Sequence, residues 1–344
     1  MSATTIRVLA VTNMYPTASN PTYGSFVETQ MGAIARAGVK VEIDFVNGRR
    51  STSQYATGLL RVKRLARRGA FDLVHAHYGL CGFICSFQAL PLVVSYWGDD
   101  LLGTPNGRGG LTPKSRVTVL LSRVAARRAD GINCESEEMR RRLPGSIDRE
   151  IIHVIPNGVN TNVFFPGSRE AARQRLGITG SERLILFPNT PTERRKRLDL
   201  AEAAMRLLLA AGIPGRLWIV QGVRPNDMPD YYRAADCLLL TSDWEGSPNV
   251  VKEAICCELP VVSVDAGDVR WLLGLTEGSV LVERDPLAIA EGLRRVLTQT
   301  TPGSGRRGRE ELAIERTAQR IVAVYGKAIA RRSQHDHAGR QSAT

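Results

Sequence analysis

The chain has 344 residues, of which 43% are hydrophobic, 23% charged and 6% aromatic, and this composition excludes fibrous, disordered and membrane-spanning proteins. Its length favours two domains, and the sparse aromatic and threonine-rich alternation argues against one large sandwich or barrel. The net charge is +12, of which residues 1–155 carry +8, so phosphorylated ligands, an anionic membrane or nucleic acid are the partners to consider. Because 40 of the 46 basic residues are arginine, codon bias explains the excess at least as readily.

The first half of the chain alternates strand-like runs with helical patterns such as 26–37. The expected strands are 6–12, 39–46, 71–75, 91–96, 130–134 and 151–155. Such alternation predicts a parallel sheet covered by helices. We therefore expect an N-terminal Rossmann-like domain over residues 1–160.

A second series of the same kind follows a Gly-, Asn- and Pro-rich stretch at 157–180, which we interpret as the interdomain connection. The expected strands are 184–188, 216–221, 237–241, 260–264 and 279–282. The second domain is predicted over 161–308. A separate last helix is predicted at about 309–332, and a disordered tail at 333–344.

Cysteine and histidine patterns indicate neither disulfides nor a metal. The six cysteines show no repeated spacing and mostly lie in apolar runs, as reduced core residues do. His75 and His77 share one face of a strand, but no Cys, Asp or third His accompanies them. We expect no bound metal and no cofactor.

The start of the chain has no secretory leader pattern, and no run of about 18 apolar residues occurs, so a cytoplasmic location is expected. The basic segment 61–68, preceded by Leu59 and Leu60, could lie along the inner face of an anionic membrane with its apolar side inward, or could be a solvated face. Basic segments without aromatic interleaving or a zinc pattern do not predict nucleic-acid binding.

The most informative stretch is 241–254, Thr-Ser-Asp-Trp-Glu-Gly-Ser-Pro-Asn-Val-Val-Lys-Glu-Ala, which ends a strand and starts a helix. Ser247 is predicted as the N-cap and Pro248 as part of the first helical turn. The free N–H groups after them would face the crevice at the carboxyl ends of the strands and attract an anion such as pyrophosphate, with Gly246 allowing close approach.

Two carboxylates flank this turn, Glu245 before it and Glu253 in the helix. Each can accept paired hydrogen bonds from a vicinal diol, such as those of a sugar and a ribose. The alternative is that Glu245 caps a neighbouring turn and that Glu253 is an exposed helix residue.

The spacing of Glu245 and Glu253 within Glu-Gly-Ser-Pro-Asn…Lys-Glu-Ala resembles the Glu-x7-Glu signature of the retaining glycosyltransferases of family 4, the group 1 transferases. Three more segments are similar to motifs of that family: the loop 16–30, Asp-Leu-Val-His-Ala-His at 72–77, and Val-Ile-Pro-Asn-Gly-Val at 154–159. The resemblance implies an α/β GT-B fold, with two Rossmann-like doubly wound domains facing a cleft. It also implies that the first domain holds the acceptor and that the last helix packs back on it.

The resemblance further implies roles for individual residues. Glu253 would bind the ribose, Glu245 the transferred sugar and Lys196 the diphosphate, while Gly24 would let a loop approach the phosphates. The implied donor-binding set is Gly24, Arg194, Arg195, Lys196, Glu245, Gly246, Ser247, Pro248, Asn249 and Glu253. The implied catalytic set is Glu245, Lys196 and Asp100, acting by positioning and charge stabilisation without a metal.

Two positions depart from the family pattern. Trp97 stands where many members have a histidine before Gly-x-Asp, and tryptophan neither accepts a proton nor carries charge, although its ring can stack on a sugar. Asp100 carries over from that motif, and His77 and Trp97 are predicted on the acceptor side. The family's phosphate-binding arginine is absent at Asn189 or Thr190, and Arg194 or Arg195 either replaces it or lies in a solvated loop.

The predicted function is transfer of a hexosyl unit from a UDP- or GDP-linked sugar to a glycan, glycolipid or lipid-linked acceptor in cell-surface polysaccharide synthesis. Residues 221–224, the expected base-contacting stretch, do not identify the base. The alternatives are a non-catalytic nucleotide-sugar-binding protein on the same scaffold and a GT-B-fold epimerase or phosphorylase.

Overall fold

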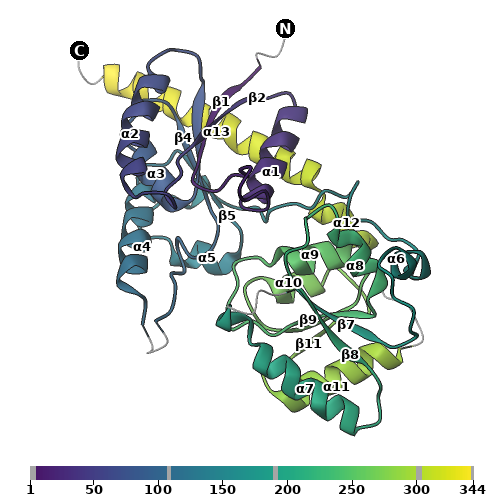
Figure 1. Cartoon of the computed structure of the whole chain (residues 1–344). Coiled ribbons are helices and arrows are strands. Elements are labelled where there is room, and N and C mark those ends of the chain that lie inside the picture. The colour runs from purple at the N-terminus through teal and green to yellow at the C-terminus, as the bar shows by residue number, and fades with distance from the viewer. Residues whose placement is uncertain (1–4, 107–109, 189–192, 300–303, 342–344) are drawn as a thin grey trace. The chain divides into compact units, whose positions relative to one another are not determined.

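The computed structural model describes residues 5–106, 110–188, 193–299 and 304–341, the last seven of them as backbone only. The chain divides into two compact units: residues 1–157 with 314–344, and residues 158–313. Each contains one parallel β-sheet covered by α-helices (Figure 1). Each unit is described by itself.

The first unit contains a six-stranded parallel sheet in the order β2-β1-β3-β4-β5-β6. The strands are β1 (Arg7–Thr12), β2 (Lys40–Phe45), β3 (Leu73–His77), β4 (Leu92–Tyr96), β5 (Gly131–Cys134) and β6 (Ile152–Val154). The helical segments are α1 (Ser25–Arg36), α2 (Ser53–Ala66), α3 (Gly79–Cys85), α4 (Pro113–Ala126), α5 (Glu137–Arg142), η1 (Arg149–Ile151) and α13 (Ile314–Gln341). Strands β3, β4 and β5 are buried along their whole length, as expected for strands covered on both faces.

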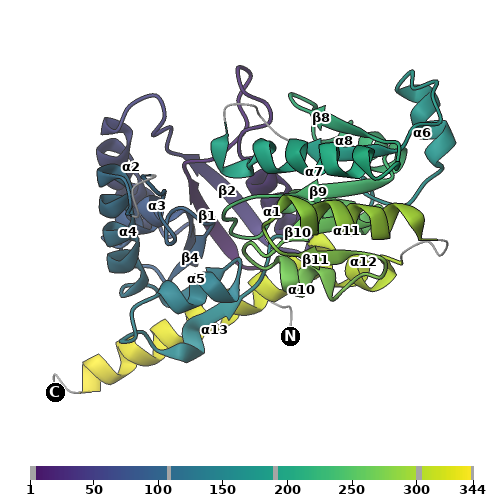
Figure 2. The ribbon, with the colours of Figure 1, turned by 90° about the horizontal axis from the view of Figure 1, so that it is seen from below.

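Helices cover both faces of this sheet (Figures 1 and 2). On one face the core joins β-strand side chains to α2, α3 and α4, and on the other it joins them to α1 and α13. Helix α13 buries residues at helical spacing, so its apolar stripe explains why it lies on the sheet. These residues are Ile314, Ala318, Ile321, Val324, Tyr325 and Ala328.

The second unit contains a five-stranded parallel sheet in the order β11-β10-β9-β7-β8. The strands are β7 (Leu184–Pro188), β8 (Arg216–Val220), β9 (Cys237–Leu240), β10 (Val261–Val264) and β11 (Val280–Val282). The helical segments are α6 (Arg169–Arg175), η2 (Arg194–Lys196), α7 (Leu198–Ala210), α8 (Met228–Ala234), α9 (Asn249–Cys256), α10 (Val269–Leu273), α11 (Pro286–Thr298) and α12 (Arg306–Leu312). Helices α7 and α11 cover one face, and α8, α9, α10 and α12 cover the other.

The expected doubly wound α/β architecture is confirmed, and the observed strands lie within two residues of the expected ends. The stretch 157–180 is not a linker, because α6 lies within it and packs on α8 of the second unit. All six cysteines are buried and unpaired. Among the described helices, none is both long enough and apolar enough to cross a bilayer.

The end of the chain differs from the expected single helix at 309–332. Ala313 is extended, and the carbonyl of the preceding Leu312 accepts a hydrogen bond from the N–H of Val159, so the helical run breaks into α12 and α13. Helix α12 packs on α9 of the second unit, whereas α13 belongs to the first. The backbone of α13 continues to Gln341, so most of the segment 333–344, which was expected to be a disordered tail, is helical. The helix can continue because this segment contains no proline and extends a helix that already packs on the sheet.

Candidate active site

The second sheet reverses its strand order between β7 and β9, which are adjacent and parallel. From the ends of two such strands the chain leaves in opposite directions, which opens a crevice at the carboxyl edge of the sheet. The loop that follows β7 contributes η2, and the loop that follows β9 contributes 241–248. Most of the donor-binding residues expected in this unit therefore fall on the two loops that border one crevice.

Glu245 is the centre of a charged cluster in this crevice. Its Oε1 atom accepts hydrogen bonds from Lys196 Nζ at 2.6 Å and Ser242 Oγ at 2.8 Å, and lies 2.9 Å from Arg195 Nη1. Burial raises the pKa of Glu245, but the charges of Lys196 and Arg195 outweigh it, so the pKa lies below its ordinary value. Glu245 is therefore a carboxylate at neutral pH, only 8% exposed, with two cations held beside it.

The loop after β7 is held in place by main-chain contacts. The carbonyl of Lys196 accepts from Thr241 Oγ1 at 2.6 Å, and the carbonyl of Arg195 accepts from the N–H of Asp243 at 2.8 Å. The Arg195 guanidinium also lies 5.1 Å from the centroid of the Trp244 ring. Arg194 is exposed, so of the two arginines expected to replace the family's phosphate ligand, Arg195 is the one in the cluster. The positions Asn189 and Thr190 lie outside the described residues.

Helix α9 begins at Asn249, with Pro248 at the N-cap and no side-chain cap. The prediction that Ser247 caps this helix is wrong, because its hydroxyl donates to Asp268 Oδ2 at 2.7 Å instead. The first N–H groups of a helix have no acceptor within it, so the N-terminus of α9 beside Gly246 retains donors for an anion. Asp268 follows β10, and burial raises its pKa to about 6.

Glu253 lies in the second turn of α9 and is partly buried, so the alternative of an exposed helix residue is wrong. The hydroxyl of Tyr232, a fully buried residue of α8, donates to Glu253 Oε2 at 2.6 Å. Burial raises the pKa of Glu253 to about 7, although the Tyr232 hydrogen bond and the charge of Lys252 act in the opposite direction. The two forms of this carboxyl group are therefore nearly balanced at neutral pH.

Arg284 is a site residue that the sequence analysis missed. It follows β11, and its Nη2 atom donates to the carbonyls of Ser242, Asp243 and Asp265 at 3.0, 3.1 and 3.3 Å. One guanidinium thus joins the loop after β9 to the loop after β10. Contacts to carbonyl groups do not depend on the residue type of the acceptor, so no sequence pattern could have revealed them.

In the first unit, Gly24 precedes α1 in a left-handed conformation with φ of 74°. A Cβ atom there would lie 2.3 Å from the carbonyl carbon of Met14, so only glycine fits this turn. Asp100 is fully buried and accepts hydrogen bonds at 3.0 Å from the N–H groups of Trp97, Gly98 and Gly79. Its contacts hold the loop after β4 against the start of α3, while burial raises its pKa to about 7.

His77 and Trp97 lie together at the carboxyl end of the first sheet. Their rings stack with centroids 5.8 Å apart, and the ring centroid of Phe26 in α1 lies 4.6 Å from that of Trp97. His77 is fully buried, which lowers its pKa to about 3 and keeps it neutral. Trp97 is partly exposed, so of the two residues expected on the acceptor side only Trp97 has accessible surface within this unit.

The neighbouring histidine on β3 is part of a buried network. His75 is hydrogen-bonded through Nδ1 to the hydroxyl of Tyr325 at 2.7 Å, and through Nε2 to Ser95 Oγ at 2.8 Å. It therefore joins β3 to β4 and α13. In the described part of the chain, no three His, Cys, Asp or Glu side chains form a group that could hold a metal.

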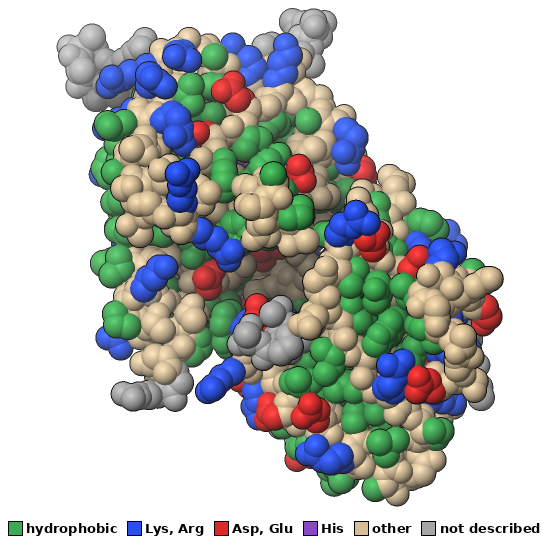
Figure 3. Space-filling model, viewed as in Figure 1, with side chains coloured by type: hydrophobic (Ala, Val, Ile, Leu, Met, Phe, Trp, Pro, Cys, Tyr) green, Lys and Arg blue, Asp and Glu red, His purple; other side chains and the backbone are tan. Residues whose placement is uncertain are grey.

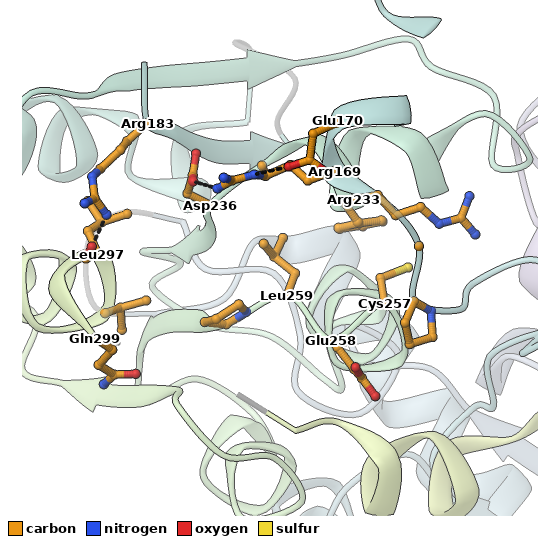
Figure 4. A pocket seen from close by; sticks show the side chains of 16 residues that line it. Arg169, Glu170, Arg183, Arg233, Asp236, Cys257, Glu258, Leu259, Leu297 and Gln299 are labelled. Atoms are coloured by element: carbon orange, nitrogen blue, oxygen red, sulfur yellow. Dashed lines mark hydrogen bonds and ion pairs between the residues drawn. The ribbon is translucent and has the colours of Figure 1, made fainter. Parts of the chain in front are cut away.

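A hollow of about 680 Å³ lies at the opposite edge of the second sheet (Figure 4). Several of its charged side chains already have partners: Asp236 accepts from Arg169 at 2.6 Å and from the N–H of Leu184 at 2.7 Å, and Arg183 contacts the carbonyl of Leu297. Arg183, Asp236 and Pro260 directly precede β7, β9 and β10, so the hollow lies at the amino edge of the sheet, whereas sheets of this kind bind ligands at the carboxyl edge. The hollow is therefore not the candidate active site.

The residues expected to contact the base follow β8. Gly222 has a φ of 69°, and Arg224 donates to Asp227 at 2.8 Å. The side chains of Arg224 and Asp227 thus pair across a local turn, in which the N–H of Asp227 donates to the carbonyl of Arg224.

Comparison with known proteins gives a family for both units. The model described as Glycosyltransferase Family 4 matches residues 6–163, and the model described as Glycosyl transferases group 1 matches residues 194–299. The D-inositol 3-phosphate glycosyltransferase of Geodermatophilus obscurus is 28% identical, over 79% of this chain and 70% of that protein.

Two solved structures show the same fold. A sucrose-phosphate synthase from Thermosynechococcus elongatus superposes with a TM-score of 0.75 at 18% identity, covering 94% of this chain and 99% of that one. Anabaena HepE, solved in complex with UDP-glucose, superposes with a TM-score of 0.62 at 16% identity, covering 98% of this chain and 100% of that one. With two doubly wound units, the matching family models and these neighbours, the chain belongs to the group 1 glycosyltransferases of the GT-B fold.

Proposed function

We propose that this glycosyltransferase is a retaining enzyme that moves a hexosyl unit from a nucleoside diphosphate sugar to a glycan, glycolipid or lipid-linked acceptor, without a metal ion. The observation that carries the proposal is the cluster of the buried Glu245 with the partly buried Lys196 and Arg195 at the strand-order reversal of the second sheet. A carboxylate beside two cations and a helix N-terminus matches the mixed chemistry of sugar hydroxyls and a diphosphate. The UDP-glucose bound by HepE supports this class of donor.

In this proposal the cluster exchanges partners when the donor binds. The diphosphate oxygens take the charges of Lys196 and Arg195, and the carboxylate of Glu245 turns to the hydroxyls of the hexose. The N-terminus of α9 adds main-chain N–H donors that stabilise the negative charge developing on the leaving diphosphate. Glu253 accepts hydrogen bonds from the ribose diol in its ionised form.

The reaction requires no strong base from the first unit. His77 is buried and neutral, and both oxygens of Asp100 already accept from main-chain N–H groups. We propose that the bond from the hexose C1 to the leaving phosphate oxygen breaks while the acceptor oxygen bonds to C1 on the same face. The acceptor proton passes to that phosphate oxygen, so charge and atoms balance.

The acceptor is proposed to be an anionic or lipid-linked glycan of cell-surface polysaccharide synthesis. The first unit carries the whole net charge of +12, because the second unit holds equal numbers of basic and acidic residues, and this favours an acidic acceptor. The name of the Geodermatophilus relative indicates a phosphorylated acceptor for that protein.

The test is an assay of nucleoside diphosphate release with EDTA present, using UDP-, GDP- and ADP-linked hexoses and a panel of lipid-linked and polyol phosphate acceptors. We expect release with one donor family, undiminished by EDTA, and a product whose anomeric configuration, read by NMR, matches that of the donor. An inverted product or loss of activity in EDTA contradicts the proposal. Donor binding without turnover would favour a non-catalytic protein, and an isomerised sugar or sugar phosphate would favour an epimerase or phosphorylase.

A further inference from the structure

Helices α2 and α4 of the first unit, with their C-terminal flanks, carry basic residues and no acidic ones. In 53–68 and 113–128 the basic residues are Arg61, Lys63, Arg64, Arg67, Arg68, Lys114, Arg116, Arg123, Arg127 and Arg128. Among the described residues, Arg61 is the one member of this set that pairs with a carboxylate, that of Asp44 at 2.5 Å. The two helices flank α3 on one side of the sheet (Figures 1 and 2), so their charges gather on one face.

Large apolar side chains are exposed among these charges. Leu60 of α2 is 68% exposed, Leu120 and Val117 of α4 are 60% and 56% exposed, and Phe87 after α3 is 48% exposed. Lys63 Nζ lies 5.7 Å from the centroid of the Phe87 ring, which links α2 to the end of α3. We refer to the exposed apolar and basic residues of α2, α4 and Phe87 as the α2–α4 face. Figure 3 shows such a mixture of hydrophobic and basic side chains along its left edge, where α2 and α4 lie in Figure 1.

The apolar residues of this face are not the ones that make α2 amphipathic. Leu59, Val62 and Leu65 pack into the core beneath the helix, so the apolar side expected to enter a membrane covers the sheet instead. Leu60 lies outside that stripe, next to the exposed Arg64. The side chain of Leu60 therefore has no role in packing the core.

We propose that the α2–α4 face docks on the surface of an anionic lipid bilayer. Leu60, Leu120 and Phe87 would enter the headgroup region, where their apolar area leaves water. The unpaired basic residues beside them would contact lipid phosphates, each contributing about 1 kcal/mol near such a surface. A nucleic acid would contact the basic side chains but would leave the leucines in water. The exposed apolar residues therefore favour a bilayer over a nucleic acid. The inference concerns a surface separate from the transfer chemistry and does not depend on it.

The test is flotation of the whole protein with vesicles of phosphatidylcholine alone and of phosphatidylcholine mixed equally with phosphatidylglycerol. We expect binding to the anionic vesicles only, weakened by salt. The double variant Arg64→Gln/Arg123→Gln should partition about 30-fold more weakly, which is the loss of about 1 kcal/mol at each site. The double variant Leu60→Ser/Leu120→Ser should bind the anionic vesicles at least about tenfold more weakly, which is the lower limit expected from the burial of one leucine.

Matched controls lie on the second unit, where Leu209 and Leu287 are 51% and 67% exposed and Arg206 and Arg307 are exposed. Leu209→Ser/Leu287→Ser and Arg206→Gln/Arg307→Gln should bind anionic vesicles as the unchanged protein does. Circular dichroism and thermal melting of each variant confirm that it is folded. The proposal is overturned if the unchanged protein does not float, if the controls lose as much binding, or if Leu60→Ser/Leu120→Ser binds normally, since the face would then recognise polyanions in general.

Discussion

The two sheets share one strand order over five strands but present different chemistry at equivalent places. Strands β2-β1-β3 of the first unit and β8-β7-β9 of the second each surround the point where the strand order reverses. In the second unit that point is bordered by Lys196, Arg195 and Glu245, which are charged and paired. In the first unit it is bordered by Gly24 and by the neutral rings of His77 and Trp97.

The shared fold therefore sets the position of the two crevices, whereas the loops set the chemistry of each. A charged crevice suits an anionic donor, and a neutral crevice with an aromatic ring suits a hydroxylated acceptor, because such a ring can stack on a sugar face. Charge should therefore govern binding in the second crevice and shape in the first crevice, while the net positive charge of the first unit as a whole favours an acidic acceptor.

The largest effect is expected from Lys196→Met. The substitution removes a cation 2.6 Å from Glu245, and in our proposal this cation stabilises the charge of the leaving diphosphate. We expect kcat/KM to fall on the order of 100- to 1,000-fold, as for other preorganised charge-stabilising groups. The matched control is Arg194→Met, an exposed neighbour whose loss should change kcat/KM less than about threefold. Equal losses in the two variants would contradict the assignment of the cluster.

A loss of stability without any change of charge is expected from Gly24→Ala. The new Cβ would collide with the main chain at Met14 and Tyr15 in a left-handed turn. Gly38→Ala is the control, because Gly38 also has a positive φ, of 92°, but has nothing within 4 Å of the new atom. The control should cost about 1 kcal/mol and Gly24→Ala distinctly more, measured by denaturant unfolding. If both variants were equally stable, close backbone approach would not shape the first crevice.

A smaller loss is expected from Arg284→Met, which releases three carbonyls of the loops after β9 and β10. We expect about a tenfold decrease in kcat/KM, mostly through KM for the donor, because the loop that holds Glu245 becomes less ordered. Arg270→Met is the control, since Arg270 pairs with Asp265 but is 72% exposed. A donor KM as low as that of the control would show that Arg284 does not position the site.

The smallest effect is a pH shift in Tyr232→Phe. Glu253 accepts ribose hydroxyls as a carboxylate in our proposal, so donor binding should strengthen as pH rises through its pKa of about 7. The lost hydroxyl no longer favours the ionised form, so the midpoint should move to higher pH. At pH values well above both midpoints, the unchanged protein and Tyr232→Phe should bind the donor with nearly equal affinity. Isothermal titration across pH tests this, and an unchanged midpoint would contradict it.

Sequence reasoning located the strands well because each is a short apolar run between turn residues, as in Leu-Ile-Leu-Phe at the start of β7. It also singled out Glu245 and Lys196, by the Glu-x7-Glu spacing and by the family resemblance, and the structure brings their side chains together. It placed one helix at 309–332 where Ala313 breaks the run, since the break depends on a main-chain contact with Val159.

Roles that depend on side-chain partners could not be predicted. Ser247 fits a capping pattern, yet it binds Asp268, which lies 21 residues further along the chain. His77 fits a site residue, yet its side chain is fully buried with its ring stacked on that of Trp97, and burial is a property of the packed fold. No sequence pattern marks Arg284, because its acceptors are main-chain carbonyl groups, which every residue type carries.

The most direct test of the account is calorimetric titration of the metal-free protein with UDP-, GDP- and ADP-linked hexoses, repeated with Glu253→Gln and with the exposed-residue control Glu202→Gln. We predict that one donor family binds the unchanged protein and the control equally, and binds Glu253→Gln at least about tenfold more weakly, since a hydrogen bond to a charged group contributes about 1.5–3 kcal/mol. Equal affinity for Glu253→Gln and the unchanged protein would contradict a donor site in the crevice between β7 and β9.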